Sequence, residues 1–134
     1  MLLIIGIACG TLVLAVCAYL LYSKRDPYKH LPVFTVEDLQ RFNGTEGSIY
    51  IGAGNLVFDV SSCEAYRPGN NYSVFAGKDA TVALARMSLS AADMNIEASL
   101  SPQEKTTLQE WLDFYIKRKN YPVIGRLTRK SKTS

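Results

Sequence analysis

Tyrosines offer the most distinctive chemistry in this 134-residue chain, which contains eight of them. Tyr66 and Tyr72 flank a polar turn at residues 68–71, and Tyr121 precedes a proline near the C-terminus. A deprotonated tyrosine is one of the side chains that bind haem iron. A loop tyrosine more often covers the edge of a core and hydrogen-bonds its hydroxyl. Spacing alone therefore favours a structural role for these residues.

Most other site chemistries lack the residues that they need. The single histidine, His30, lies in a polar linker, which argues against histidine-based triads, histidine metal sites and bis-histidine haem ligation. Cys9 and Cys17 lie in an apolar segment and only Cys63 follows it, so the spacing supports neither a disulfide within the domain nor a zinc site. Residues 52–55 indicate a hairpin turn, not a phosphate-binding loop. A hydrolase or a transferase is therefore not expected.

The first 23 residues differ from the rest because they contain no charged side chain. An apolar run at residues 2–22 would span roughly 30 Å as a helix, the thickness of a bilayer core. Basic residues follow it closely: Lys24, Arg25 and Lys29. This predicts a transmembrane anchor at residues 1–23 held by membrane lipid, a linker at residues 24–32, and a following domain that faces the cytosol. Cleavage of the run as a signal peptide is the alternative.

Strand and helix signals are mixed after the linker. Two short strands are expected at residues 48–51 and 56–60, joined by the glycine-rich turn. Helix starts are indicated by residues that can cap them: Thr35, Asp79 and Ser101. The helix after Asp79 is expected to continue through Met87, and the last helix to end near Lys119. The last helix carries apolar residues at helical spacing: Leu108, Trp111, Leu112 and Tyr115.

The C-terminal 21 residues, 114–134, hold seven basic side chains and no acidic one. Such a segment can bind nucleic acid, but a chain with a membrane anchor more simply meets anionic lipid or an acidic partner. An ordinary solvated tail at residues 128–134 is the other interpretation. We therefore expect no nucleic-acid partner.

The run YRPGNNYSVFAGKDA at residues 66–80 resembles the haem-pocket signature of the membrane-associated progesterone receptor family, a branch of the cytochrome b5-like fold. The similarity includes FDV at residues 58–60, before this run, and YPVIGRL at residues 121–127, after it. It covers nearly all of residues 33–127. The resemblance implies an α+β fold for residues 33–127, in which a small mixed sheet carries the helices that form a haem pocket. This domain would follow the single N-terminal transmembrane helix.

The resemblance also implies roles for individual tyrosines. Tyr72 matches the residue that ligates the iron of ferric haem b from one side. Tyr66 matches a second tyrosine of the pocket, and Tyr121 a third tyrosine near the ligand or a haem propionate. Because the sequence offers no candidate for a sixth ligand, the haem is expected to be five-coordinate.

Further matches are partial. Asp79 matches an aspartate of the family's Gly-x-Asp-Ala stretch, and capping of the following helix is its physical explanation. Family members often have a lysine directly before the last tyrosine, where this chain has Asn120 and places Lys119 one residue earlier. They also often have Phe-Tyr-Gly-Pro where this chain has Ala-Tyr-Arg-Pro, with Arg67 at the third position. The first departure bears on a propionate contact and the second on the loop beside the iron.

By resemblance, the expected protein is a membrane-anchored haem-binding module of the endoplasmic reticulum, with its domain in the cytosol. It would support membrane haem-thiolate monooxygenases of the cytochrome P-450 type, sterol metabolism or haem handling, and it could bind a sterol. The open haem face would allow a haem-mediated homodimer. Two alternatives are a haem-independent, sterol- or lipid-responsive membrane adapter and a b5-like electron-transfer domain.

Overall fold

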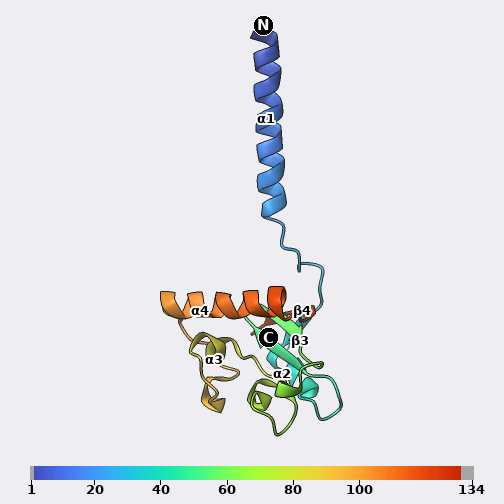
Figure 1. The fold of residues 1–134 in the computed structure, drawn as a ribbon, viewed down its shortest axis with the longest axis vertical. Helices are drawn as coiled ribbons and strands as arrows, with labels where there is room; N and C mark the ends of the chain where they lie inside the picture. The colour runs from blue at the N-terminus through green and yellow to red at the C-terminus, as the bar shows by residue number, and fades with distance from the viewer. Residues whose placement is uncertain (1, 131–134) are drawn as a thin grey trace.

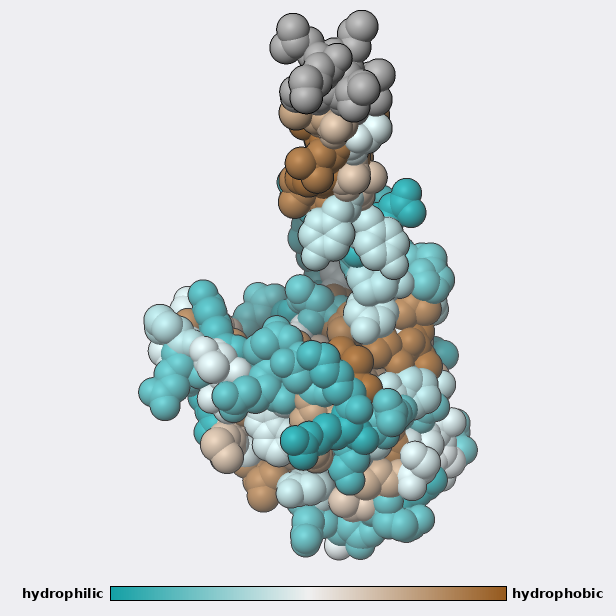
Figure 2. Space-filling view, turned by 45° about the horizontal axis from the view of Figure 1, so that its top comes forward, coloured by the Kyte–Doolittle hydropathy of each residue, from teal (hydrophilic) through white to brown (hydrophobic). Residues whose placement is uncertain are grey.

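The computed structural model describes residues 2–130, with side chains described at residue 6 and from residue 8 onward. An N-terminal helix, α1 (Leu2–Ser23), projects away from a small domain (Figure 1). Its described side chains are exposed, and in Figure 2 many of them are apolar, whereas the face of the domain in view is largely hydrophilic.

The membrane span predicted for residues 1–23 is not found. Across the described residues, no helix is long and apolar enough to cross a membrane. The helix itself forms where it was expected. The side chains of residues 1–5 and 7 lie outside the described part.

The domain is built on a mixed four-stranded sheet. Its strands are β1 (Val33–Thr35), β2 (Tyr50–Ala53), β3 (Leu56–Asp59) and β4 (Val123–Thr128), in the spatial order β1-β4-β3-β2. β1 pairs with β4 in parallel, and the other neighbours are antiparallel. The α+β class predicted from the sequence is confirmed.

The hairpin is tighter than the sequence predicted. Ala53 pairs with Leu56, so the turn is only Gly54-Asn55, and Gly52 lies inside β2. The N–H of Gly52 donates to the carbonyl of Lys78, and the carbonyl of Gly52 accepts from the N–H of Ala80. A side chain at Gly52 would meet Leu127 at 2.7 Å. This glycine therefore allows a close approach of two chain segments and does not make the turn.

Three short or medium helices cover the sheet: α2 (Val36–Leu39), α3 (Thr81–Ala85) and α4 (Pro102–Asp113). Capping boxes at Thr35 and Ser101 confirm two of the predicted helix starts. α3 ends two residues before Met87, whose φ of +52° is incompatible with a continuing helix. After Met87 the chain forms a 3₁₀ turn, Ala91–Asp93.

The main core lies where α3, the end of α4 and the 66–76 segment meet β2 and β3. Its buried members include Ile51, Phe58, Ala83 and Leu84. Tyr66, Tyr115 and Tyr121 belong to the same cluster, so one edge of the core is made of phenol rings. A smaller cluster, Leu39, Val57 and Leu127, is packed with Phe34 and Tyr50. The phenol edge of the main core is where the candidate site lies.

Candidate functional site

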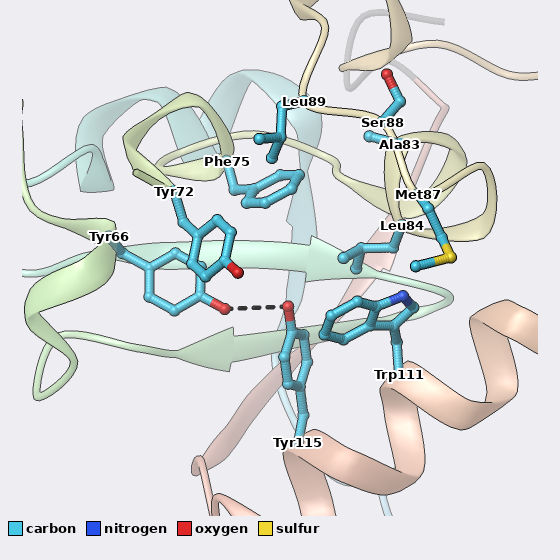
Figure 3. Close-up of a pocket in the computed structure, with 10 residues that line it drawn as sticks. All are labelled: Tyr66, Tyr72, Phe75, Ala83, Leu84, Met87, Ser88, Leu89, Trp111 and Tyr115. Carbon is cyan, nitrogen blue, oxygen red and sulfur yellow. Dashed lines mark hydrogen bonds between the residues drawn. The ribbon is translucent and has the colours of Figure 1, made fainter. Parts of the chain in front are cut away.

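A cavity of about 260 Å³ opens at the phenol edge of the core (Figure 3). α3 and the residues after it supply one wall, α4 another, and the segment around Tyr72 a third. The walls are mostly apolar: Phe75, Ala83, Leu84, Met87, Leu89 and Trp111. Met87 and Leu89 are 76% and 56% exposed, so the apolar lining reaches the surface. We call this space the apolar cavity.

A second cavity of about 280 Å³ adjoins the first. The two share four lining residues: Tyr66, Tyr72, Trp111 and Tyr115. The second cavity is more polar, because Cys63, Lys119 and Tyr121 also line it. The structure thus brings together Tyr66, Tyr72, Tyr121 and Lys119, all of which the sequence singled out. We call this space the polar cavity.

Tyr66 and Tyr115 form a buried pair of phenols. The Tyr66 hydroxyl donates a hydrogen bond to the Tyr115 hydroxyl at 3.0 Å, and the two residues are only 4% and 2% exposed. Burial raises the pKa of Tyr115 to about 12 and raises the pKa of Tyr66 further still. Burial, with Cys63 and Tyr66 nearby, also raises the pKa of Tyr121. These three phenols therefore keep their protons at neutral pH.

Tyr72 differs from these three phenols in its exposure. It is 41% exposed, and its ring lies 5.8 Å from that of Tyr66 and 5.9 Å from that of Phe75. In Figure 3 its hydroxyl turns toward those of Tyr66 and Tyr115. Tyr72 is thus the phenol that both borders the two cavities and meets solvent.

The loop that carries Tyr72 is held by its own polar residues. Arg67 donates to the carbonyls of Gly47 and Ser61, at 2.6 and 2.7 Å. The Asn70 side chain donates to the carbonyl of Glu64. The N–H of Tyr72 donates to the carbonyl of Ala65 at 2.9 Å. Arg67, which departs from the family pattern, thus holds the loop through carbonyl groups outside the cavities, and Tyr72 still borders both cavities.

The backbone conformation explains the other departure from the family pattern, which is Asn120 in place of a lysine. Asn120 has a φ of +52°, in the left-handed region, where asparagine is favoured over most residues and lysine is not. Asn120 itself lines neither cavity. Lys119 lines the polar cavity, and its ammonium group lies 5.8 Å from the centre of the Phe114 ring. The cation that the family pattern places before the tyrosine is therefore supplied one residue earlier.

Asp79 lines neither cavity. It is 2% exposed, and its carboxylate accepts hydrogen bonds from the Thr81 N–H and hydroxyl at the start of α3. It also forms an ion pair with Arg129 at 2.8 Å. The N-cap of α3 is Ala80, which makes no side-chain capping bond, so Asp79 precedes the cap and holds the first residue of the helix instead. Thr128 and Arg129, assigned to the tail from the sequence, belong to the folded domain, while residues 131–134 lie outside the described part.

Tyr115 is the site residue that the sequence reasoning missed. The apolar spacing placed it on the buried face of the last helix, and no role beyond packing was considered. Its ring lies 5.9 Å from that of Trp111 and 5.4 Å from that of Tyr121. The spacing of four residues between Trp111 and Tyr115 was the available signal, since it puts both rings on one helix face.

Comparison with known proteins agrees with this geometry. Residues 35–128 match the family model of the cytochrome b5-like heme/steroid binding domain. A solved Arabidopsis thaliana protein, described as having a cytochrome b5-like fold, superposes with a TM-score of 0.63 at 38% identity, covering 78% of this chain and 97% of that one. The chain therefore belongs to the cytochrome b5-like heme/steroid-binding family.

Named relatives define the branch within that family. Probable steroid-binding protein 3 of Arabidopsis thaliana is 40% identical over 70% of this chain and 96% of its own length. Human neuferricin is 39% identical over 85% of this chain, which spans only 44% of neuferricin. Membrane steroid-binding protein 1 of Arabidopsis thaliana is 36% identical over 58% of this chain and 37% of its own length. This branch is the membrane-associated progesterone receptor family.

Proposed function

We propose that this protein binds ferric haem b, with the phenolate of Tyr72 as the single protein ligand of the iron. The donor set at the two cavities suits such a group. Apolar and aromatic walls suit the body of a porphyrin, and the cationic Lys119 suits its acidic edge. Tyr121, which also lines the polar cavity, supplies a hydroxyl beside that cation.

The observation that carries the proposal is the difference in exposure among four neighbouring phenols. Tyr66, Tyr115 and Tyr121 are at most 8% exposed, and burial favours their neutral forms. A metal ligand has to lose its proton and reach an open space. Tyr72 is 41% exposed at the border of both cavities and is therefore the phenol best placed to do so.

The chemistry that haem would supply here is that of ferric iron, which a hard anionic ligand such as a phenolate favours over ferrous iron. Histidine ligation has no support, since the chain's one histidine, His30, lies in the linker next to the exposed residues Lys24, Arg25 and Lys29. We therefore propose that the protein is not an enzyme but a haem-holding module that supports membrane monooxygenases or hands haem on.

We also propose that α1 attaches the domain to a membrane, in the endoplasmic reticulum by family resemblance, with the domain in the cytosol. Exposed apolar side chains on α1 and the basic residues that follow it support attachment: Leu12, Leu14, Leu21, Lys24, Arg25 and Lys29.

The test is titration of the full chain, purified in a mild detergent, with ferric haem. We expect stoichiometric binding with a phenolate-to-iron charge-transfer band, which Tyr72→Phe removes. Tyr50→Phe is the matched control, because Tyr50 stacks on Phe42 with ring centres 4.2 Å apart and lines neither cavity. Binding that is indifferent to Tyr72, or equally weakened in both variants, would refute the ligand assignment.

A second candidate function is a haem-independent adapter that responds to a sterol or another apolar molecule. The mostly apolar lining of the apolar cavity favours it, and the names of several relatives include steroid binding. The same purified chain decides between the two. If haem does not bind but a fluorescent sterol quenches Trp111, the single tryptophan and a lining residue of both cavities, the adapter function takes precedence.

A further inference from the structure

A π-helical turn at Phe114–Arg118 carries Tyr115 into the site. Directly after α4 the hydrogen-bond pattern widens, and the N–H of Lys119 donates to the carbonyl of Phe114 at 2.9 Å. Isolated π-helical turns are rare and are often found at functional sites. Tyr115 is 2% exposed and packs edge-on against Phe58, with ring centres 5.4 Å apart. Its ring is therefore tightly held where its hydroxyl meets the cavities.

The hydrogen bond within the phenol pair leaves one proton unassigned. A hydroxyl has one proton to donate and can accept through its lone pairs. Within the pair, Tyr66 is the hydrogen-bond donor and Tyr115 the acceptor. The Tyr115 hydroxyl therefore has a proton available for a second oxygen, and in Figure 3 the hydroxyls of Tyr66, Tyr72 and Tyr115 converge on one space.

We propose that Tyr115 is a positioning residue for the iron ligand: its hydroxyl accepts a hydrogen bond from Tyr66 and donates one to the oxygen of Tyr72. This inference rests on the proposed haem ligation by Tyr72. A hydrogen bond to a charged oxygen is stronger than one between neutral groups. Tyr115 would thus hold the Tyr72 oxygen in place and moderate its donation to the iron. Tyr66 cannot serve as this donor while its proton is committed to Tyr115.

The relay separates the roles of the two buried phenols. Removing the Tyr115 hydroxyl takes away the donor to Tyr72. Removing the Tyr66 hydroxyl leaves that donor in place and takes away only the group that orients it. The two conservative substitutions are therefore expected to differ, although each removes one oxygen atom from the same hydrogen bond.

The experiment compares Tyr115→Phe, Tyr66→Phe, Tyr72→Phe and the control Tyr50→Phe in the full chain titrated with ferric haem. Tyr115→Phe should weaken ferric haem binding by about tenfold, since a hydrogen bond to a charged group is lost. It should also shift the charge-transfer band and make the midpoint potential of the bound iron more negative. Tyr66→Phe should weaken binding by no more than about threefold.

The outcomes distinguish this inference from the proposed function. If Tyr72→Phe still gives the wild-type spectrum, the ligand assignment itself fails. If Tyr72→Phe loses the spectrum while Tyr115→Phe behaves like Tyr50→Phe, only the relay is overturned. A larger effect of Tyr66→Phe than of Tyr115→Phe would also overturn it.

A measurement on the wild type keeps the test independent of variant folding. A phenolate oxygen that accepts a hydrogen bond changes its vibrational frequency when the exchangeable proton becomes a deuteron. The resonance Raman bands of the iron-bound phenolate should therefore shift in heavy water. Bands that stay unchanged would overturn the relay even if Tyr115→Phe failed to fold.

Discussion

Arg129→Ala should destabilise the domain strongly, although the sequence places Arg129 in a basic tail. Its guanidinium donates to both carboxylate oxygens of Asp79 and to the carbonyl of Gly54 at 2.7 Å. The side chain of Asp79 is 1% exposed and that of Arg129 is 22% exposed. The substitution therefore leaves a carboxylate buried without its cation, and the arginine's own burial makes this more than a surface effect.

The magnitude follows from what the carboxylate keeps and what it loses. Breaking a fully buried ion pair costs about 3–5 kcal/mol. Asp79 keeps its hydrogen bonds from Thr81, and partial exposure of Arg129 lets water reach the site, so we expect about 3 kcal/mol. For a domain of this size that corresponds to a fall in melting temperature of roughly 12–24 °C.

Urea unfolding followed by the fluorescence of Trp111, the chain's single tryptophan, measures this effect. Lys130→Ala is the matched control, because it removes a neighbouring cation that is exposed. A double-mutant cycle with Asp79→Asn should give a coupling energy above about 1 kcal/mol. An Arg129→Ala variant within about 0.5 kcal/mol of Lys130→Ala would refute the reasoning.

Two further predictions test the site's electrostatics and backbone. Folding raises the pKa values of Tyr66, Tyr115 and Tyr121 above the ordinary value of 10.0. Their contribution to the free energy of unfolding is therefore complete below about pH 10. It is lost as the pH rises further, because the phenols of the unfolded chain ionise first. Urea unfolding measured above about pH 10 should show a free energy of unfolding that falls with pH, and it should fall less steeply in Tyr66→Phe. A variant whose free energy falls as steeply as that of the wild type would contradict this prediction. Asn120→Lys should cost about 1 kcal/mol and Asn120→Gly almost nothing, because of the left-handed backbone there; equal melting temperatures would count against this account.

Local signals in the sequence were sufficient where a structure depends on neighbouring residues. The capping boxes at Thr35 and Ser101 involve side chains and N–H groups three residues apart, so their residue types could be recognised directly. The family resemblance supplied the fold class and the pocket tyrosines, which composition and spacing alone left as structural residues.

Contacts between distant segments were not predictable in the same way. The local sequence indicates a turn at Gly52. Its backbone hydrogen bonds to Lys78 and Ala80 instead make it a strand residue that a second segment approaches closely. Arg129 reads as one more cation in a basic run, and only the fold shows that it lies beside Asp79, 50 positions earlier. Both features depend on long-range pairing, for which the local sequence carries no periodic signal.

The phenol edge shows why the sequence could locate the site but could not assign a separate role to each of its tyrosines. Without the family resemblance, Tyr66, Tyr72, Tyr115 and Tyr121 are equivalent as chemical groups in the sequence, and their spacing does not rank them as ligands. In the fold, a hydrogen bond joins two of them, burial raises the pKa of three of them, and Tyr72 is the one of the four that meets solvent. The fold therefore makes four identical side chains chemically different. The π-helical turn contributes to this difference because it brings Tyr115 against Tyr66, and the proposed relay depends on that contact.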